Sequence, residues 1–150
     1  MGKILAICTS PRRGTVKTPV PDAVLTPEWG ILGDAHGGAW HRQVSLLSAE
    51  KIEAFRKKLW VDYGAFGENL VVEGFDFRAL PVPSRLAIGE VVLETTQIGK
   101  ECHSDCAIRQ QTGECIMPRE GVFARVLHGG TIHVGDPVAL LPPPEHPPLR

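Results

Sequence analysis

Neither sign of charge prevails in this chain of 150 residues, because 16 Lys and Arg face 17 Asp and Glu and leave a formal net charge of -1. The chain therefore lacks a global field that would attract nucleic acid or an anionic membrane, and any anion site must be local. No run of about 18 apolar residues is present, so no membrane-spanning helix is predicted. The first ten residues lack the features of a secretory signal peptide, and we expect a cytoplasmic protein with neither a membrane nor a nucleic acid as partner.

Aromatic residues are scarce, at 6%, and two nucleotide-binding motifs are missing. There is no Gly-x-Gly-x-x-Gly between a strand and a helix and no Gly-x-x-x-x-Gly-Lys-Ser/Thr, so neither a dinucleotide fold nor a P-loop is predicted. Glycine and proline are plentiful instead, with 16 and 13 residues, which implies many turns. The hydrophobic content of 43% fits one domain of ordinary size.

Short apolar or alternating segments bounded by turn residues predict a mainly β protein. The expected strands are residues 3–8, 23–26, 43–47, 69–73, 85–88, 91–97, 131–134 and 137–141. Their close spacing is typical of a barrel or a sandwich. We assign one domain to residues 1–141, followed by a flexible, proline-rich tail of residues 142–150.

One surface helix is expected after Ser48, a residue type suited to the N-cap position. Ile52, Phe55 and Leu59 then follow at helical spacing and form one apolar face. We expect this face to lie on the core and the opposite face to meet solvent.

The densest group of polar residues, residues 99–119, contains three of the four cysteines. Cys102 lies between Lys100 and His103, whose positive charge would favour the thiolate form and make it a nucleophile at neutral pH. Cys8, by contrast, ends an apolar strand and is predicted to fill space in the core.

The same segment admits a metal site as an alternative. Cys102, His103, Cys106 and Cys115 form a three-sulfur, one-nitrogen set of the kind that holds structural zinc. Cys102 and Cys106 have the spacing of a zinc motif, whereas Cys115 lacks a paired partner. Both interpretations stay open on the residues alone.

A second polar cluster joins the glycine-rich segment of residues 33–38 to Trp40, His41 and Arg42. Backbone N–H groups exposed by glycines, two imidazoles and a guanidinium are suited to an anion such as phosphate. For His36 and His41, a loop-bracing role is an equally good interpretation.

Several segments, taken in order, resemble the MOSC domain, the family named after the C-terminal domain of molybdenum cofactor sulfurase. The segments are GDAHGG (33–38), QVSLL (43–47), FGENL (66–70), LAIGE (86–90), TQ (96–97), CH (102–103) and GVFARVLHGG (121–130). The resemblance extends from residue 3 to about 141 and is strongest to small stand-alone MOSC proteins. It implies a β-barrel of the pyruvate kinase barrel type with one or more short surface helices, in agreement with the strand pattern.

The resemblance also implies a function. MOSC domains are associated with binding of the molybdenum cofactor, a molybdopterin, and with sulfur transfer, and the family's characteristic cysteine corresponds to Cys102. Cys102 would then carry sulfur as a persulfide, assisted by Lys100 and His103, and would act during cofactor maturation or delivery. The residues expected to hold the phosphate and the oxyanionic metal centre are Arg12, His36, Lys100, Arg119 and Arg125.

No pyridoxal phosphate-binding desulfurase fits within this chain, so sulfur must come from a partner. The implied partners are a cysteine desulfurase or another sulfur donor, and a molybdoenzyme or a molybdopterin-synthesis enzyme. Two alternative functions remain open: a non-catalytic module stabilised by zinc, and a molybdenum-dependent reductase of N-hydroxylated compounds in which Cys102 is a molybdenum ligand. Arg125 also admits a simpler interpretation as an arginine that points outward from a strand or helix edge.

Overall fold

The computed structural model describes residues 2–12, 16–35, 37–99 and 121–142. The first half of the chain contains β1 (Gly2–Thr9), β2 (Thr18–Val20), β3 (Asp22–Thr26), β4 (Gly30–Ile31), β5 (Val44–Ser48), α1 (Ala49–Phe55) and β6 (Leu70–Glu73). The second half contains the short 3-10 helix η1 (Phe77–Ala79), β7 (Arg85–Ile88), β8 (Val91–Ile98), β9 (Val122–His128), β10 (Gly130–His133) and β11 (Pro137–Leu140).

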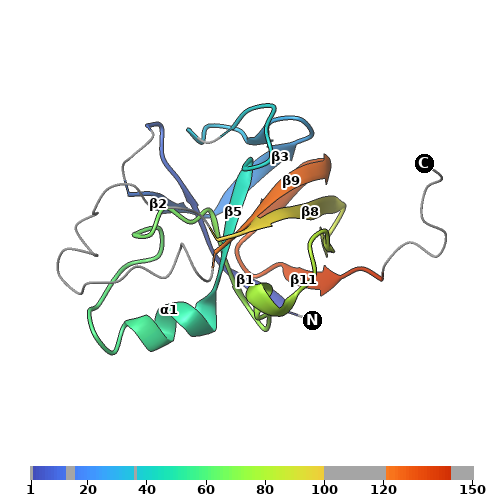
Figure 1. Ribbon diagram of the computed structural model, residues 1–150. Coiled ribbons are helices and arrows are strands. Elements are labelled where there is room, and N and C mark those ends of the chain that lie inside the picture. Colours follow the sequence, from blue (N-terminus) through green and yellow to red (C-terminus); the bar gives the residue numbers. More distant parts are fainter. Residues whose placement is uncertain (1, 13–15, 36, 100–120, 143–150) are drawn as a thin grey trace.

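The main sheet closes into a barrel. Within the described residues its order is β11-β7-β8-β9-β5-β6-β1-β2, and β11 also pairs with β1, so all of these strands except β2 form a closed ring of seven. Closure leaves no open edges in the ring. The mainly β barrel expected from the sequence is confirmed. A second, three-stranded sheet, β10-β3-β4, lies at one end, where Figure 1 shows β3 beside β9.

One pair in the ring, β5 with β6, is parallel, and all other pairs are antiparallel. Parallel strands need a crossover connection, and here the crossover contains α1. Figure 1 shows α1 continuing from β5 and lying outside the barrel. The sequence therefore uses its one α-helix in the described residues to cover the outer face of the sheet.

Two hydrophobic cores result from this arrangement. The barrel interior contains large aliphatic side chains from every strand of the ring, including Ile4, Leu46, Leu70, Leu86, Leu93 and Val138. A smaller core lies between the outer face of the barrel and α1, and includes Cys8, Leu47, Ile52, Phe55 and Phe66. β1 contributes to both: side chains of a strand alternate between faces, and an irregularity in the register between Ile4 and Ala6 shifts the alternation, so that Ile4 and Ile7 point inward while Ala6 and Cys8 point outward.

The helix is shorter than its sequence pattern predicts. Ser48 stands at the N-cap position, but its side chain makes no capping hydrogen bond, and α1 ends at Phe55. Leu59 therefore lies beyond the helix, in a turn, although it still packs against the smaller core. Beyond the helix, the Arg56 Nε atom donates to the Val61 carbonyl at 2.9 Å, and this bond holds the turn that follows.

Candidate functional site

A pocket of about 620 Å³ opens beside β8 and β9, and we call it the β8–β9 pocket. Its volume falls in the range of roughly 300–1,000 Å³ that small-molecule and cofactor sites occupy. The turn after β3, the loop before β5 and the two strands each supply part of the wall. The polar and aromatic residues that line it are Glu28, Trp40, His41, Gln43, Thr96 and Arg125.

Gln97, near the end of β8, connects this wall to the point where the cysteine-rich segment begins. Its Oε1 atom accepts a hydrogen bond from Arg42 Nε at 3.2 Å and lies 2.8 Å from His41 Nε2. Its Nε2 atom donates to the Gly99 carbonyl at 2.8 Å. The Gly99 N–H in turn donates to the Gly121 carbonyl at 2.6 Å. Gly99 and Gly121 flank residues 100–120 and form what we call the stem.

This arrangement determines where His41 carries a proton. A guanidinium can only donate hydrogen bonds, so the Gln97 atom that faces Arg42 must be the amide oxygen. An amide oxygen can only accept, and His41 Nε2 therefore donates to it. In the neutral ring the other nitrogen, Nδ1, then carries no proton and can accept a hydrogen bond.

Aromatic rings and hydroxyl contacts hold the loop before β5 against the barrel. The Thr96 hydroxyl hydrogen-bonds the backbone carbonyls of His41 and Phe123. The Arg42 guanidinium lies over the Phe123 ring, 5.2 Å from its centroid, and the Trp40 and His41 rings meet edge to face at 5.9 Å. The loop is thereby fixed to both strands that form the floor of the pocket.

Arg125 reaches the same pocket from β9 and is held by Glu94 of the neighbouring strand. Both Nε (3.1 Å) and Nη2 (2.6 Å) of Arg125 bond Oε1 of Glu94, while Arg85 on β7 bonds Oε2 at 3.2 Å. Burial by itself would raise the pKa of Glu94, but the hydrogen bonds and charges of the two arginines outweigh it and lower that pKa. Glu94 therefore stays ionised at neutral pH, and one positive charge remains over the three groups.

A buried ion pair holds Asp34 in the glycine-rich segment, which precedes the loop before β5. We call this loop, residues 39–43, the pocket loop. Lys17 Nζ lies 2.7 Å from Asp34 Oδ1, and both side chains are fully buried. Ser10 completes the arrangement, since its N–H donates to the same Asp34 oxygen at 3.1 Å and its hydroxyl accepts from Lys17 at 3.3 Å. The Asp34 carboxylate is therefore paired with the buried Lys17 cation.

Close packing explains two glycines of this region. A Cβ atom on Gly37 would overlap the indole of Trp29, and one on Gly64, which has a φ of 95°, would collide with the Lys17 carbonyl. Gly64 and its neighbour Phe66 each donate a backbone N–H to Glu68, at 2.9 and 3.0 Å. Burial raises the pKa of Glu68 above its ordinary value, although these N–H groups and Lys17 oppose the rise.

Cys8 lies in the smaller core, as its sequence context predicts. The residue is fully buried, and burial raises the pKa of its thiol to about 12, with the nearby Glu68 charge acting in the same direction. The thiol is therefore protonated at neutral pH and has no nucleophilic character.

The structure places two of the predicted site residues and leaves the others outside the described residues. Arg125 points outward from β9, lines the β8–β9 pocket and is paired with Glu94. Arg12 is exposed in the bend after β1 and is not among the described residues that line the pocket. The predicted residues that lie outside the described part of the chain are His36, Lys100, Cys102, His103, Cys106, Cys115 and Arg119. The tail from residue 143 onward lies outside it as well.

Sequence reasoning did not single out Glu94 or Gln43 as site residues. Gln43 is buried, and its Oε1 atom accepts the Val126 N–H at 3.0 Å, so it fixes β9 behind the pocket. A charged residue inside the alternating segment of residues 91–97 was the available signal for Glu94. Its partners could not be identified from that signal, because strand pairing brings Arg85 and Arg125 to it from 9 and 31 residues away.

The described residues offer neither a metal cluster nor a membrane-spanning helix. Within residues 2–12, 16–35, 37–99 and 121–142, no three His, Cys, Asp or Glu side chains are grouped so that they could hold a metal ion. The predicted zinc set lies outside these ranges. Across the same part of the chain, no helix has both the length and the apolar character that crossing a bilayer requires.

Comparison with known proteins places the chain in a family. The family model of the MOSC domain matches residues 33–139, which include the pocket loop, β8 and β9. The chain belongs to the MOSC domain family, which is associated with the molybdenum cofactor. A comparison with curated proteins found no match.

Solved structures share the same fold. The YuaD protein of Bacillus subtilis has a TM-score of 0.77 and 17% identity over 92% of this chain and 94% of its own. YiiM of Geobacillus stearothermophilus has a TM-score of 0.71 and 19% identity over 95% of this chain and 76% of its own. YiiM of Escherichia coli has a TM-score of 0.68 and 17% identity over 96% of this chain and 72% of its own.

Proposed function

We propose that this MOSC domain binds the molybdenum cofactor in the β8–β9 pocket and handles sulfur through Cys102 during cofactor maturation or delivery. The observation that carries the proposal is the position of Gln97. It bonds both to His41, which lines the pocket, and to Gly99, three residues before Cys102. Three residues span at most roughly 11 Å, and this short separation from Gly99 in sequence supports the proposed role of Cys102.

The described residues of the pocket suit the proposed cofactor. A pterin is planar and carries a phosphate, so its site needs an aromatic surface and cationic or N–H donors. Trp40 supplies the ring, and Arg125 supplies a cationic donor. Glu94 neutralises Arg125 only in part, because the same carboxylate also pairs with Arg85, and this favours an anion beside Arg125 although Glu28 in the lining opposes it. When bound, the cofactor would supply a molybdenum centre at the pocket.

The sulfur step in this proposal balances without an added oxidant. The Cys102 thiolate attacks the terminal sulfur of a persulfide on the donor, a cysteine desulfurase or a similar enzyme. A new S–S bond forms at Cys102 while the S–S bond of the donor breaks, and the donor leaves as a thiolate. Lys100 and His103 stabilise the attacking thiolate. A molybdoenzyme or a molybdopterin-synthesis enzyme would be the acceptor protein. A reducing cytoplasm suits this thiol chemistry.

The proposal is tested by native mass spectrometry of protein purified anaerobically without reductant. We expect adducts of a pterin cofactor and of a single sulfur atom on the wild-type chain. Cys102→Ala should lose the sulfur adduct and keep the fold, whereas Cys115→Ser should retain the sulfur adduct. A Cys102→Ala variant that still accepts one sulfur per chain from a desulfurase would refute the assigned role. A zinc adduct alone, lost in Cys106→Ser or Cys115→Ser, would favour the zinc-stabilised module instead.

A further inference from the structure

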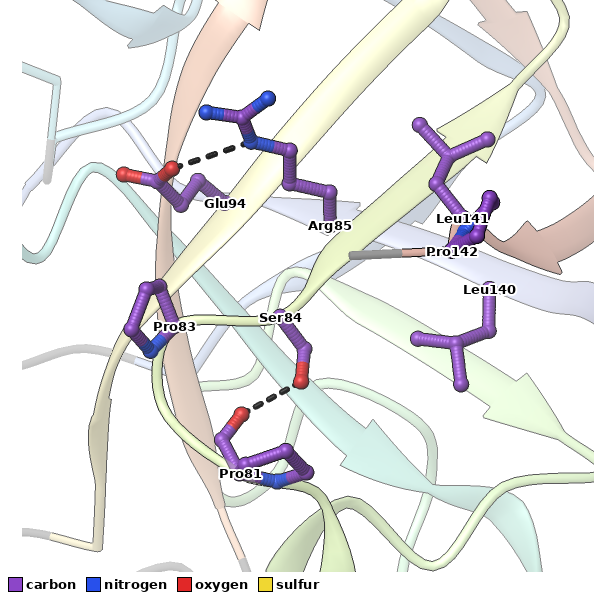
Figure 2. Close-up of a pocket in the computed structure, with 8 residues that line it drawn as sticks. All are labelled: Pro81, Pro83, Ser84, Arg85, Glu94, Leu140, Leu141 and Pro142. Carbon is purple, nitrogen blue, oxygen red and sulfur yellow. Dashed lines mark hydrogen bonds and ion pairs between the residues drawn. The ribbon is translucent and has the colours of Figure 1, made fainter. Parts of the chain in front are cut away.

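A second pocket, of about 210 Å³, lies where β7 meets β11, and we call it the β7–β11 pocket. Figure 2 shows its residues as sticks, with Glu94 on one side and Leu140, Leu141 and Pro142 on the other. Among the described residues, the linings of the two pockets share no member. The β7–β11 pocket is therefore a separate site, and its ligand is a separate question from the proposed function.

Most of the wall of this pocket is apolar. The apolar residues are Pro81, Pro83, Leu140, Leu141 and Pro142. An apolar cavity of about 150 Å³ is large enough to hold benzene, so this volume suits an apolar body of one six-membered ring or a short branched chain. Leu140 is 46% exposed, which is a large apolar area to leave in water at the mouth of a pocket.

Arg85 contributes a cationic side chain to the lining of this pocket, and only the Nε atom of its guanidinium is bonded to Glu94. Its Nε atom bonds Glu94 Oε2 at 3.2 Å, and within the described residues its two terminal nitrogens form no ion pair. Those two nitrogens are the edge with which a guanidinium grips a carboxylate in a bidentate manner. Because the Glu94 carboxylate also pairs with Arg125, it neutralises Arg85 only in part.

The walls are held in place before any ligand arrives. The Ser84 N–H donates to Thr95 Oγ1 at 2.7 Å, and the Ser84 hydroxyl bonds the Pro81 carbonyl, as the dashed line in Figure 2 marks. On the opposite wall, the Leu141 N–H donates to the Arg85 carbonyl at 2.8 Å and extends the β7–β11 pairing. Such pre-organisation lowers the entropy cost of binding.

We propose that the β7–β11 pocket binds a small carboxylate with an apolar body of one ring or a short branched chain. The apolar body lies among the prolines and leucines, and the carboxylate pairs end-on with the terminal nitrogens of Arg85. Glu94 acts as a positioning residue, because it holds the Arg85 side chain through Nε and leaves the other edge of the guanidinium for the ligand.

The test uses benzoate as the probe and benzyl alcohol as an uncharged compound of similar size. Amide chemical shifts in a ¹⁵N-labelled wild-type chain should move saturably with benzoate, with the largest changes at Ser84, Arg85 and Leu141. Benzyl alcohol should bind about tenfold more weakly, since it lacks the charge-assisted hydrogen bonds. Equal affinity for the two compounds, or shifts that map elsewhere on the chain, would overturn the proposal.

Three variants separate the parts of the site. Arg85→Gln should weaken benzoate binding about tenfold and leave benzyl alcohol binding unchanged, because only the charged contact is lost. Leu140→Ser should weaken both compounds. Arg125 bonds the same Glu94 carboxylate but lines the other pocket. Arg125→Gln should therefore change benzoate affinity less than Arg85→Gln does. If Arg85→Gln does not fold, Arg85→Lys replaces it, since lysine keeps the charge but lacks the bidentate edge. Full benzoate affinity in the folded Arg85 variant would refute the assignment.

Discussion

The carboxylate of Glu94 holds Arg125 through one oxygen, with Nε at 3.1 Å and Nη2 at 2.6 Å from Oε1. Its other oxygen holds Arg85 at 3.2 Å. Each arginine lines a different pocket, so this one buried carboxylate bonds to a lining residue of each. The strand register produces this arrangement, because Arg85, Glu94 and Arg125 are direct cross-strand neighbours on β7, β8 and β9.

The two arginines provide a matched pair of variants for the proposed cofactor site. Arg125→Gln should lower cofactor affinity about tenfold or more, because a charged donor within the β8–β9 pocket is lost. Arg85→Gln also removes a positive charge that pairs with Glu94, but Arg85 does not line that pocket. This variant should therefore lower cofactor affinity much less. Molybdenum content per chain after expression under identical conditions measures the difference. Equal losses in both variants would show that the pocket is not the cofactor site.

The hydrogen bonds of two histidines predict opposite neutral tautomers. His41 Nε2 faces the Gln97 oxygen and must carry the proton, whereas His128 Nδ1 lies 2.7 Å from the Glu90 carbonyl and must carry it there. Long-range ¹H–¹⁵N spectra at a pH where both rings are neutral should show the two patterns side by side. Gln97→Ala should convert His41 to a mixture and leave His128 unaltered. A single Nδ1–H tautomer for His41 in the wild-type chain would refute the Gln97 arrangement.

The buried ion pair of Lys17 and Asp34 should be costly to break on one side. Lys17→Met removes the Lys17 cation from the buried Asp34 carboxylate and should lower the free energy of unfolding by about 3–5 kcal/mol. The double variant Lys17→Met, Asp34→Leu should lose less than the sum of the two single variants, because no unpaired charge remains. Urea denaturation of all four proteins measures this coupling, and additive losses would contradict it.

Cys8 should make the protein less stable in alkali. Its thiol has a pKa of about 12 in the folded chain against an ordinary value of 9.0, so between these values the folded state holds a proton that the unfolded state releases. The free energy of unfolding should therefore fall as pH rises above 9, by up to about 1.4 kcal/mol per pH unit. The difference between wild type and Cys8→Ala isolates this contribution from that of other groups. If the free energy of unfolding falls equally with pH in both proteins, burial does not raise the pKa of the Cys8 thiol.

Most of the strands were predictable because their signals are local. Alternation and turn residues indicated β1, β6, β7, β8 and β11 within a residue or two of their ends. The short strands β2 and β4 carry too few residues for a periodic signal, and each exists only because it pairs with a neighbour. The helix pattern ran past Phe55 because periodicity does not report the Arg56 contact that turns the chain.

The sequence by itself determined the family, the mainly β character, the burial of Cys8 and the candidate status of Arg125, since composition, alternation and ordered motifs report these properties directly. Only the tertiary structure decided that β11 pairs with β1 to complete a ring of seven strands, that Gln97 joins His41 to the stem, and that Glu94 bonds both Arg85 and Arg125. The bond of Glu94 to Arg85 and that of Gln97 to His41, for example, connect residues 9 and 56 positions apart along the chain. Strand register brings such residues together, and register depends on packing of the whole sheet rather than on any local pattern.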